Sequence, residues 1–310
     1  MTQPDLLPLP EPVPACLPDA SVVVCSRNRP AFLAEVVNSI LCGEEVPPEL
    51  IIVDQSDTPN QRLADLRPPR ACEIRYLRPG SIGLSRANNA GAAAARHEII
   101  VFTHDDVLVA PGWYAALVSG LLSAGPRAVV CGRVLAGASE VAGSFVPVIS
   151  TDGRPDVYVG RVGADVLYPM NLALYRATLR EVGGFDERLG PGTPFPGAED
   201  NDLGLRLLEA GFRIVHAPQA VVQHRAWRGD REFLPLRWTY GQAQGAFYVK
   251  YLSLRDGHMF GRLRWDLDRH LRRVPGRVLF GARRAALGDI VYVAGLLWGM
   301  AHWLLLNHRK

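Results

Sequence analysis

Short apolar segments alternate with longer segments of helical spacing along the first two thirds of the chain. The run Ser21–Cys25 is rich in β-branched residues and predicts a buried strand. Apolar residues then recur every three or four positions from Phe32 to Leu41, which predicts a helix with Pro30 in its first turn. Leu50–Val53 is a second strand-like run. The order strand, helix, strand favours a parallel α/β architecture.

The same alternation continues to about residue 223. It predicts further strands over Ile99–Thr103, Ala128–Cys131, Arg213–His216 and Ala220–Gln223. Helices are expected over 84–97, 112–124, 171–182 and 201–210, and an irregular, glycine-rich stretch over 132–170. We therefore expect one α/β domain over residues 21–230, with a mostly parallel sheet and flanking helices.

Both ends of the chain differ from this domain. Residues 1–20 are proline-rich and lack the basic and apolar segments of a secretory signal, so they predict a disordered lead. From residue 231 onward, arginine and aromatic residues lie on helical patterns, and 290–306 form an apolar run interrupted by one histidine. Residues 231–310 are therefore expected to form a separate helical region.

Composition places the chain among ordinary globular proteins. Of 310 residues, 48% are hydrophobic and 21% are charged, which excludes a disordered or fibrous protein. The five cysteines are scattered and form no C-x-x-C pair. This pattern disfavours a zinc site or a disulfide framework and favours reduced thiols in the cytoplasm.

The net charge of +3 conceals an uneven distribution. Residues 225–310 hold 16 Arg/Lys and 6 Asp/Glu, whereas residues 1–224 hold 18 and 25. The basic last third predicts an anionic partner, and its arginines cluster around aromatic and aliphatic residues as in helices that lie on anionic membranes. Nucleic acid fits less well because no recognition module is apparent. A solvated basic face is the alternative to membrane binding. The apolar run 290–306 is short for a span, and a core helix, a monotopic segment or a tilted span all remain open.

Polar groups follow three of the predicted strands. Ser26–Asn28 follow the first, Asp54 ends the second, and His104, Asp105 and Asp106 follow the third. A single aspartate after a strand is usually a turn or a helix cap. Three such strand ends in one parallel sheet meet at the same edge, where open α/β sheets bind ligands.

The first crossover has neither G-x-G-x-x-G nor a P-loop, so a diphosphate would have to be held differently. Carboxylates that bind Mg²⁺ or Mn²⁺ are the alternative, and Asp105 and Asp106 are ligands of this kind. His224 follows a later strand and is a possible third ligand, although a packed histidine is the simpler interpretation. Glu199 and Asp200 precede a helix, where they either cap it or supply a general base.

Together these segments resemble the family-2 glycosyltransferases, which have the GT-A fold. The similarity runs from Ser21 to about His224, roughly two thirds of the chain. The blocks that carry it, in the family's order, are Val22–Pro30, Ile51–Asp57, Gly83–Gly91, Ile99–Asp106, Val182–Glu187, Ala198–Ile214 and Val221–His224. His104 stands where the family often has an acid, Arg27 where an aromatic is common, and Asn88 where an arginine is common.

The resemblance implies an inverting transfer of a sugar from a UDP- or dTDP-sugar to a hydroxyl of a saccharide or lipid-linked acceptor, in cell-envelope polysaccharide biosynthesis. Asp54 would bind the base imide and Ser26 would lie near the nucleoside. Arg27, Asn28, Asn88 and Asp105 would complete the donor site. Asp106, with His224 and Asp105, would bind Mn²⁺ or Mg²⁺. Asp200 would be the general base, with Glu199 as its neighbour.

The resemblance also favours monotopic association of the last third with the cytoplasmic face of the membrane, since such transferases often use lipid-linked acceptors. Two rivals stay open at this point. A sugar-nucleotide nucleotidyltransferase would need a basic, glycine-rich loop after the first strand, and Ser26–Pro30 is not one. A degenerate, membrane-bound scaffold domain is supported by His104 and opposed by the retained Asp54, Asp106, Asp200 and His224.

Overall fold

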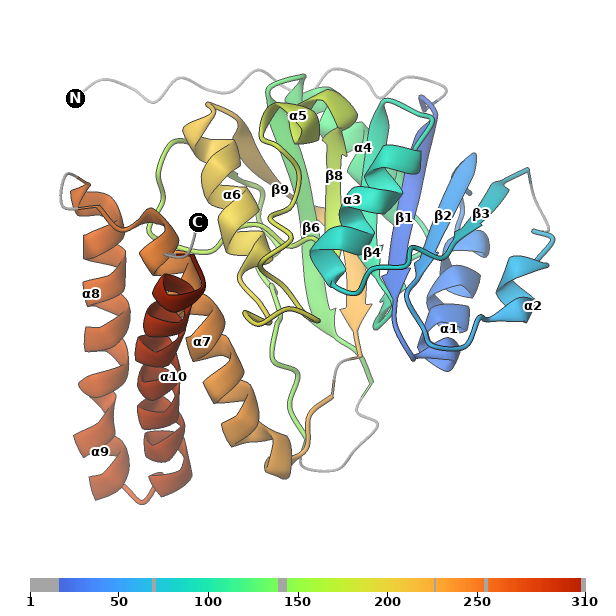
Figure 1. Ribbon diagram of the computed structural model, residues 1–310. Coiled ribbons are helices and arrows are strands. Elements are labelled where there is room, and N and C mark those ends of the chain that lie inside the picture. The colour runs from blue at the N-terminus through green and yellow to red at the C-terminus, as the bar shows by residue number, and fades with distance from the viewer. Residues whose placement is uncertain (1–16, 69–70, 139–143, 226, 254–255, 308–310) are drawn as a thin grey trace.

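A computed structural model describes residues 17–68, 71–138, 144–225, 227–253 and 256–307. In this part of the chain nine strands form one mixed sheet, with helices on both faces and a helical bundle beside it (Figure 1). The strands are β1 (Ala20–Ser26), β2 (Glu49–Asp54), β3 (Glu73–Leu77), β4 (Ile99–His104), β5 (Val107–Val109), β6 (Ala128–Ala136), β7 (Asp156–Tyr158), β8 (Asn171–Tyr175) and β9 (Arg213–His224).

The sheet has the order β3-β2-β1-β4-β8-β6-β9-β5, and β7 also pairs with β9. The first four strands are parallel, β8 is antiparallel to both β4 and β6, and β6 and β9 are parallel. The expected mostly parallel α/β sheet is therefore confirmed.

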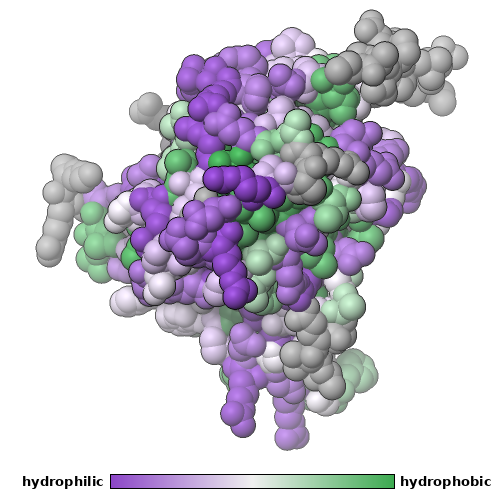
Figure 2. All heavy atoms as spheres, turned by 90° about the vertical axis from the view of Figure 1, so that its right-hand side faces the viewer, coloured by the Kyte–Doolittle hydropathy of each residue, from purple (hydrophilic) through white to green (hydrophobic). Residues whose placement is uncertain are grey.

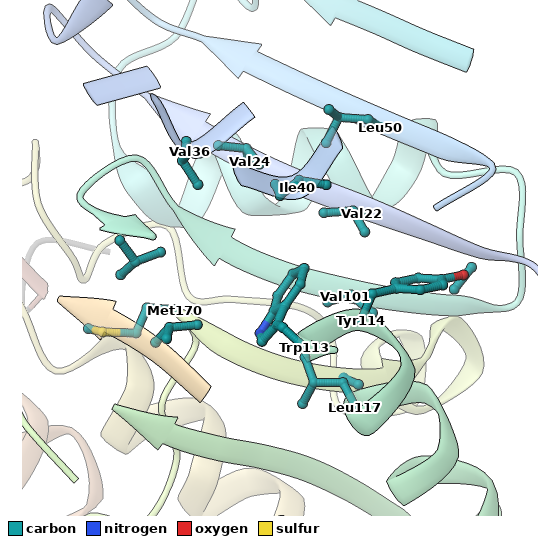
Figure 3. Close-up of a cluster of buried hydrophobic side chains, with 14 of the residues drawn as sticks. Val22, Val24, Val36, Ile40, Leu50, Val101, Trp113, Tyr114, Leu117 and Met170 are labelled. Atoms are coloured by element: carbon teal, nitrogen blue, oxygen red, sulfur yellow. The ribbon is translucent and has the colours of Figure 1, made fainter. Parts of the chain in front are cut away.

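Helices pack on both faces of this sheet. They are α1 (Pro30–Leu41), α2 (Gln61–Ala64), α3 (Leu84–Ala94), α4 (Trp113–Ala124), α5 (Arg176–Glu181) and α6 (Glu199–Glu209). One core lies under α1 and α4, where Val22 and Val24 of β1 meet Ile40 and Trp113 (Figure 3). A second core lies on the opposite face, under α3, α5 and α6. Burial on both faces explains why the central strands read as continuous apolar runs.

The expected elements differ from the structure in two places. The predicted helix over 171–182 is wrong for its first five residues, which form β8 between β4 and β6. The leucine and alanine content of this segment favours a helix, but pairing on both sides overrides that preference. The two strands expected over 213–223 are one strand, β9, whose register against β6 shifts between Gly132 and Arg133.

The last part of the chain is helical, as expected. It forms α7 (Phe233–Tyr251), α8 (Gly257–Leu271), α9 (Arg273–Leu279) and α10 (Arg283–Asn307), preceded by the short 3₁₀ turn η1 (Asp230–Glu232). Helices α7 and α10 touch backbone to backbone through glycines. A Cβ atom on Gly245 would lie 2.0 Å from the Leu296 carbonyl oxygen, and one on Gly299 would lie 2.0 Å from that of Gln242.

Buried charged groups tie α8 and α9 to α10. His270 Nδ1 lies 2.8 Å from Asp289 Oδ1, and Arg277 donates to Asp289 Oδ2 at 2.6 Å. The Tyr292 hydroxyl donates to Asp266 Oδ2 at 2.7 Å. These pairs satisfy polar groups that would otherwise be costly to bury between the helices.

The outward face of this bundle is apolar. In the described residues α10 is the helix long and apolar enough to cross a membrane, judged by length and composition alone, and a third of that apolar window is buried. By contrast, hydrophilic side chains predominate at the end of the molecule that carries α2 and β3 (Figure 2). The exposed large apolar residues of the bundle are Trp238, Phe260, Trp265, Leu271, Val278, Leu279, Phe280, Leu287, Ile290, Leu297, Trp298, Leu304, Leu305 and Leu306.

The expected boundaries stay predictions. The proposed lead, 1–20, lies mostly outside the described residues, and Ala20 is already the first residue of β1. The boundary near residue 230 coincides with η1, just before the first long helix of the bundle.

Candidate active site

The carboxyl ends of three neighbouring parallel strands bring together the polar groups that follow them. Ser26 is paired with Asp54 across β1 and β2, and Cys25 with His104 across β1 and β4. The parallel register therefore sets the Ser26 loop, Asp54 and the 104–106 segment along one edge of the sheet. This is the edge at which open α/β sheets bind ligands.

Asp105 is held inside this edge. It is 6% exposed and accepts a hydrogen bond from Ser26 Oγ at 2.7 Å. Arg29 Nη1 bridges the two acids, lying 3.1 Å from Asp105 Oδ1 and 3.0 Å from Asp106 Oδ2. Burial and the neighbouring charge of Asp106 raise the pKa of Asp105 to about 6.

Asp106 faces His224 across the end of the sheet. The antiparallel pairing of β5 with β9 sets Val107 opposite His224, and His224 Nε2 lies 3.7 Å from Asp106 Oδ1. His224 Nδ1 lies 2.8 Å from the Val148 carbonyl oxygen and must donate to it, so in the neutral ring Nε2 carries the lone pair. Burial alone would raise the pKa of Asp106, but the imidazolium form of His224 and the Arg29 guanidinium hold it well below its usual range.

This pair fits a divalent ion. An ionised carboxylate oxygen and an imidazole lone pair face one another, and both are ordinary ligands of Mn²⁺. Within the described residues no group of three His, Cys, Asp or Glu side chains is gathered for a metal, so diphosphate oxygens and water would have to complete the shell. Asp105 is engaged with Ser26 and Arg29, and its direct ligation stays a prediction.

His104, which stands where the resemblance leads us to expect an acid, ends β4. Burial lowers the pKa of its imidazole to about 4, so the ring is neutral near pH 7. Its Nε2 atom is buried and has no hydrogen-bond partner in the part of the chain that the structure describes.

Asp54 lies at the end of β2 and is 1% exposed. Its Oδ1 accepts from the Ser56 amide at 2.9 Å, and its Oδ2 accepts from the Tyr76 hydroxyl. Each carboxylate oxygen has a second lone pair, so these bonds leave capacity for a further donor. The expected contact with a base imide stays a prediction.

Arg27 and Asn28 belong to the loop after β1. Asn28 has a left-handed backbone, with φ of 56°, and its side chain exchanges two hydrogen bonds of 3.0 Å with Asp57. Asn28 therefore fastens this loop to the one after β2. Arg27 is 42% exposed in its side chain and lies 3.9 Å from Asp57, so it remains accessible to a ligand.

Asn88 lies on α3, fully buried behind the loop. The Cys25 thiol donates to its Oδ1 at 3.1 Å. Its Nδ2 has no partner among the described residues. A buried amide donor without a partner is costly, and this position is consistent with a role in ligand binding.

The acid pair lies at the N-terminus of α6. Ala198, the residue before it, adopts a left-handed backbone with φ of 62°. Glu199 is 7% exposed and its Oε2 lacks a partner in the described part, whereas Asp200 is half-buried and accepts from the Asn201 amide at 2.8 Å. Burial raises the pKa of both carboxyl groups well above their usual range. The negative charge of Asp200 raises the pKa of Glu199 further, and the negative charge of Asp165 raises the pKa of Asp200 further.

Three residues of this region carried no expected role. Arg29 lies in the block Val22–Pro30, but its sequence context gave no reason to expect a bridge between two acids. Asp165 falls in the stretch expected to be irregular. Tyr240 lies on α7, and burial raises its pKa to about 12, with three carboxylates adding to the rise, those of Asp106, Glu199 and Asp200. The Tyr240 hydroxyl of the bundle is therefore near enough to these acids to feel their charge, which local sequence patterns do not reveal.

Comparison with known proteins shows which sequences this chain resembles. The model of the family described as "Glycosyl transferase family 2" matches residues 21–148. The chain is 30% identical over 239 residues to the pre-mycofactocin glycosyltransferase of Mycobacterium tuberculosis, covering 75% of this chain and 48% of that protein. It is 26% identical over 226 residues to the O-antigen biosynthesis protein RfbC of Myxococcus xanthus, covering 67% and 17%. The chain thus spans less than half the length of these relatives.

Solved structures are similar over nearly the whole chain. The mannosyltransferase PcManGT from Pyrobaculum calidifontis, solved with GDP-Man and Mn²⁺, has a TM-score of 0.62 at 18% identity and covers 93% of this chain and 89% of its own. A fragment of S. aureus TarS with UDP-GlcNAc has a TM-score of 0.56 at 17% identity, covering 94% and 90%. Residues 21–148 therefore belong to glycosyl transferase family 2, and the described part of the chain has the GT-A fold.

Proposed function

We propose that this protein transfers a sugar, with inversion, from a UDP- or dTDP-sugar to a hydroxyl of a saccharide or lipid-linked acceptor, assisted by Mn²⁺ or Mg²⁺. The observation that carries the proposal is the pairing of Asp106 Oδ1 with His224 Nε2 at 3.7 Å, on the edge of the sheet that also carries Ser26 and Asp54. Relatives of the same fold have been solved with nucleotide sugars, in one case with Mn²⁺, which supports it.

On the donor side, the chain supplies anchors for a nucleoside diphosphate. Asp54 would accept from the base imide, and Arg27, Asn28 and Asn88 would border the nucleoside and sugar. Asp106 and His224 would hold the ion, which when bound supplies positive charge against the departing diphosphate. Arg29 keeps the two adjacent acids oriented, since its guanidinium contacts both.

On the acceptor side, Asp200 would act as the general base. The acceptor oxygen forms a bond to the anomeric carbon, the bond from that carbon to the diphosphate oxygen breaks, and the hydroxyl proton passes to Asp200. Asp200 is the more accessible acid of the pair, whereas Glu199 is buried and burial together with the Asp200 charge favours its protonated form. The N-terminus of α6 favours a carboxylate at this position.

A calorimetric or thermal-shift screen tests the donor half of the proposal. UDP, dTDP, GDP and their sugars are each titrated with Mn²⁺, with Mg²⁺ and with EDTA. We expect binding of a uridine or thymidine diphosphate that depends on the ion. Failure of every nucleotide to bind would favour a scaffold domain, and pyrophosphate release from a nucleoside triphosphate and a sugar phosphate would favour a nucleotidyltransferase.

We further propose that the bundle α7–α10 holds the protein on the cytoplasmic face of an anionic membrane as a monotopic segment. The outward face of α10 is apolar, and Leu279 and Phe280, at the end of α9, are 80% and 84% exposed. Six arginines of the stretch from α8 to the start of α10 are also exposed: Arg264, Arg269, Arg272, Arg273, Arg283 and Arg284. Exposed apolar side chains together with exposed cations on the same helices match an anionic lipid surface.

Two arginines expected in this basic surface point inward instead. Arg262 is 9% exposed and pairs with Asp165, and Arg277 pairs with the buried Asp289. Asp289 also favours a helix lying on the membrane over one that crosses it. If α10 crossed the membrane, it would separate from α7, and the Asp289 carboxylate would lose His270 and Arg277 as partners. An unpaired carboxylate is costly to place in the hydrocarbon core.

A further inference from the structure

Arg262 connects the C-terminal bundle to the catalytic domain. Its side chain, on α8, is buried, and its Nη2 lies 2.5 Å from Asp165 Oδ1. The guanidinium carbon is also 5.4 Å from the centre of the Phe247 ring of α7, which restricts its position further. Asp165 lies in the segment between β7 and β8, so this ion pair joins two parts of the chain that share no strand or helix.

Asp165 in turn lies beside the proposed base. A small cavity with about 10 Å³ of space, enough for one water molecule, is bordered by polar groups from three elements. These groups are Asp165, Asp200, Asn201 and Arg262. Asn201, the residue after Asp200, is also tied to the bundle, because its Nδ2 donates to Gln244 Oε1 on α7 at 2.9 Å.

The charge of Asp165 acts on Asp200 directly. Burial is the largest cause of the raised pKa of Asp200, and the negative charge of Asp165 is the second largest. A base must be ionised to accept a proton, so an uncompensated Asp165 would leave less of the active form at neutral pH. The ion pair with Arg262 opposes this effect by placing a positive charge 2.5 Å from Asp165 Oδ1.

The other groups around Asp200 do not supply such compensation. The titratable groups that face it in the described part of the chain are Asp165, Tyr168, Glu199, Tyr240 and Arg262. Four of these are acids, and Arg262 is the cation among them. Removal of its charge should therefore be felt at Asp200 more than removal of a charge elsewhere on α8.

We propose that Arg262 is a positioning residue for catalysis: through Asp165 it keeps Asp200 ionised and in place, so that helix α8 of the bundle is part of the catalytic machinery. The catalytic consequence rests on the proposed function, but the electrostatic relationship does not. The two can therefore be tested separately.

The first test measures Asp200 in the protein alone. The chain is labelled with ¹³C at the aspartate carboxyl, and the Asp200 signal is assigned by its loss in Asp200→Asn. We expect Arg262→Gln to raise the titration midpoint of Asp200 by about 0.5–1 pH unit, Arg262→Lys to leave it near the native value, and Asp165→Asn to lower it.

Arg161→Gln is the matched control. Arg161 also ties the start of α8 to the body, donating to Asp256 at 2.7 Å, but it is 42% exposed and does not border the Asp200 cavity. Its removal should leave the Asp200 midpoint unchanged. An equal shift in Arg161→Gln, or an unchanged midpoint in Arg262→Gln, would overturn the proposal. If Arg262→Gln does not fold, the opposite shift in Asp165→Asn decides.

The second test follows turnover against pH with the donor identified by the nucleotide screen. In Arg262→Gln, the apparent pKa on the acidic side of the kcat–pH profile should rise by the same amount as the titration midpoint of the Asp200 carboxyl. The donor KM should not change. Arg262→Lys should restore the native profile. A carboxyl shift without a matching change in turnover would leave the charge relationship intact and refute the role of Asp200 as the base.

Discussion

His224 Nε2 and Asp106 Oδ1 face one another at 3.7 Å, with the other nitrogen of the imidazole fixed on the Val148 carbonyl oxygen. This separation is too long for a hydrogen bond and short enough for one divalent ion to contact both atoms. The hydrogen bond to Val148 sets the tautomer and therefore leaves the lone pair on the side of Asp106.

Ion-dependent nucleotide binding should be lost when either partner is replaced. Asp106→Asn and His224→Ala should each weaken Mn²⁺-dependent binding of UDP at least tenfold, about 1.4 kcal/mol, because one of two protein ligands is removed. Isothermal calorimetry with and without EDTA measures the change. Asp268→Asn, which alters an exposed ion pair on α8, should bind like the native protein. Native affinity in both site variants would remove the pair as the ion site.

Replacement of the proposed base should abolish turnover but spare donor binding. Asp200→Asn should reduce kcat by about a hundredfold to ten-thousandfold, which is the usual contribution of a positioned base. Glu209→Gln, on the same helix and paired with Arg161, should be nearly neutral. A large loss in Glu199→Gln, with Asp200→Asn unaffected, would transfer the role to Glu199.

The pH dependence of turnover follows from the same carboxyl group. The folded pKa of Asp200 is raised, so its protonated and inactive form persists to higher pH than for an ordinary aspartate, which titrates at about 4. We expect kcat to fall as the pH is lowered through a midpoint well above that value and close to neutrality. A profile that stays flat down to about pH 5 would contradict this assignment.

The nucleobase should be restricted by Asp54. A buried carboxylate that accepts from an imide N–H favours uracil and thymine, so UDP and dTDP should bind at least tenfold more tightly than GDP. In Asp54→Asn this preference should shrink, because the side chain then offers both a donor and an acceptor. Competition with a fluorescent nucleotide measures the ratios. Equal binding of UDP and GDP by the native protein would exclude base recognition by Asp54.

Membrane binding should depend on the end of α9. The double variant Leu279→Ser and Phe280→Ser should float with vesicles of phosphatidylserine and phosphatidylcholine less than the native protein, since two highly exposed apolar side chains are removed. Ile149→Ser, exposed by 49% but outside the bundle, is the control. A native protein that ignores these vesicles at low salt would refute the membrane proposal.

Packing of the bundle should be sensitive to single methyl groups. Gly245→Ala would place a Cβ 2.0 Å from the Leu296 carbonyl oxygen, and the resulting overpacking should lower the free energy of unfolding by about 1–3 kcal/mol. Gly261→Ala, on α8, meets nothing within 4 Å and should be neutral or stabilising by about 0.5–1 kcal/mol. Urea denaturation compares the two variants, and an equal response would contradict the close contact.

The sequence allowed much of the fold to be predicted, because the central parallel strands are buried on both faces and their short apolar runs, rich in β-branched residues, favour strands. It failed at Asn171–Tyr175, where leucine and alanine favour a helix but neighbouring strands on both sides impose β8. Convergence of Ser26, Asp54 and Asp105 followed from strand order alone. Tyr240 and Arg262 could not be found in this way, because their approach to the site depends on how the helical bundle packs against the sheet domain.

The backbone contact between α7 and α10 has a mechanical consequence. Gly245 and Gly299 each pack against a backbone carbonyl oxygen of the opposite helix, so α7 and α10 can neither rotate nor slide past one another without a clash. This helix pair is joined to the start of α6 by the hydrogen bond between Asn201 and Gln244. If the bundle lies on a membrane as proposed, the distance between Asp200 and the lipid headgroups would therefore be constant. A lipid-linked acceptor would have to span that distance with its own saccharide chain.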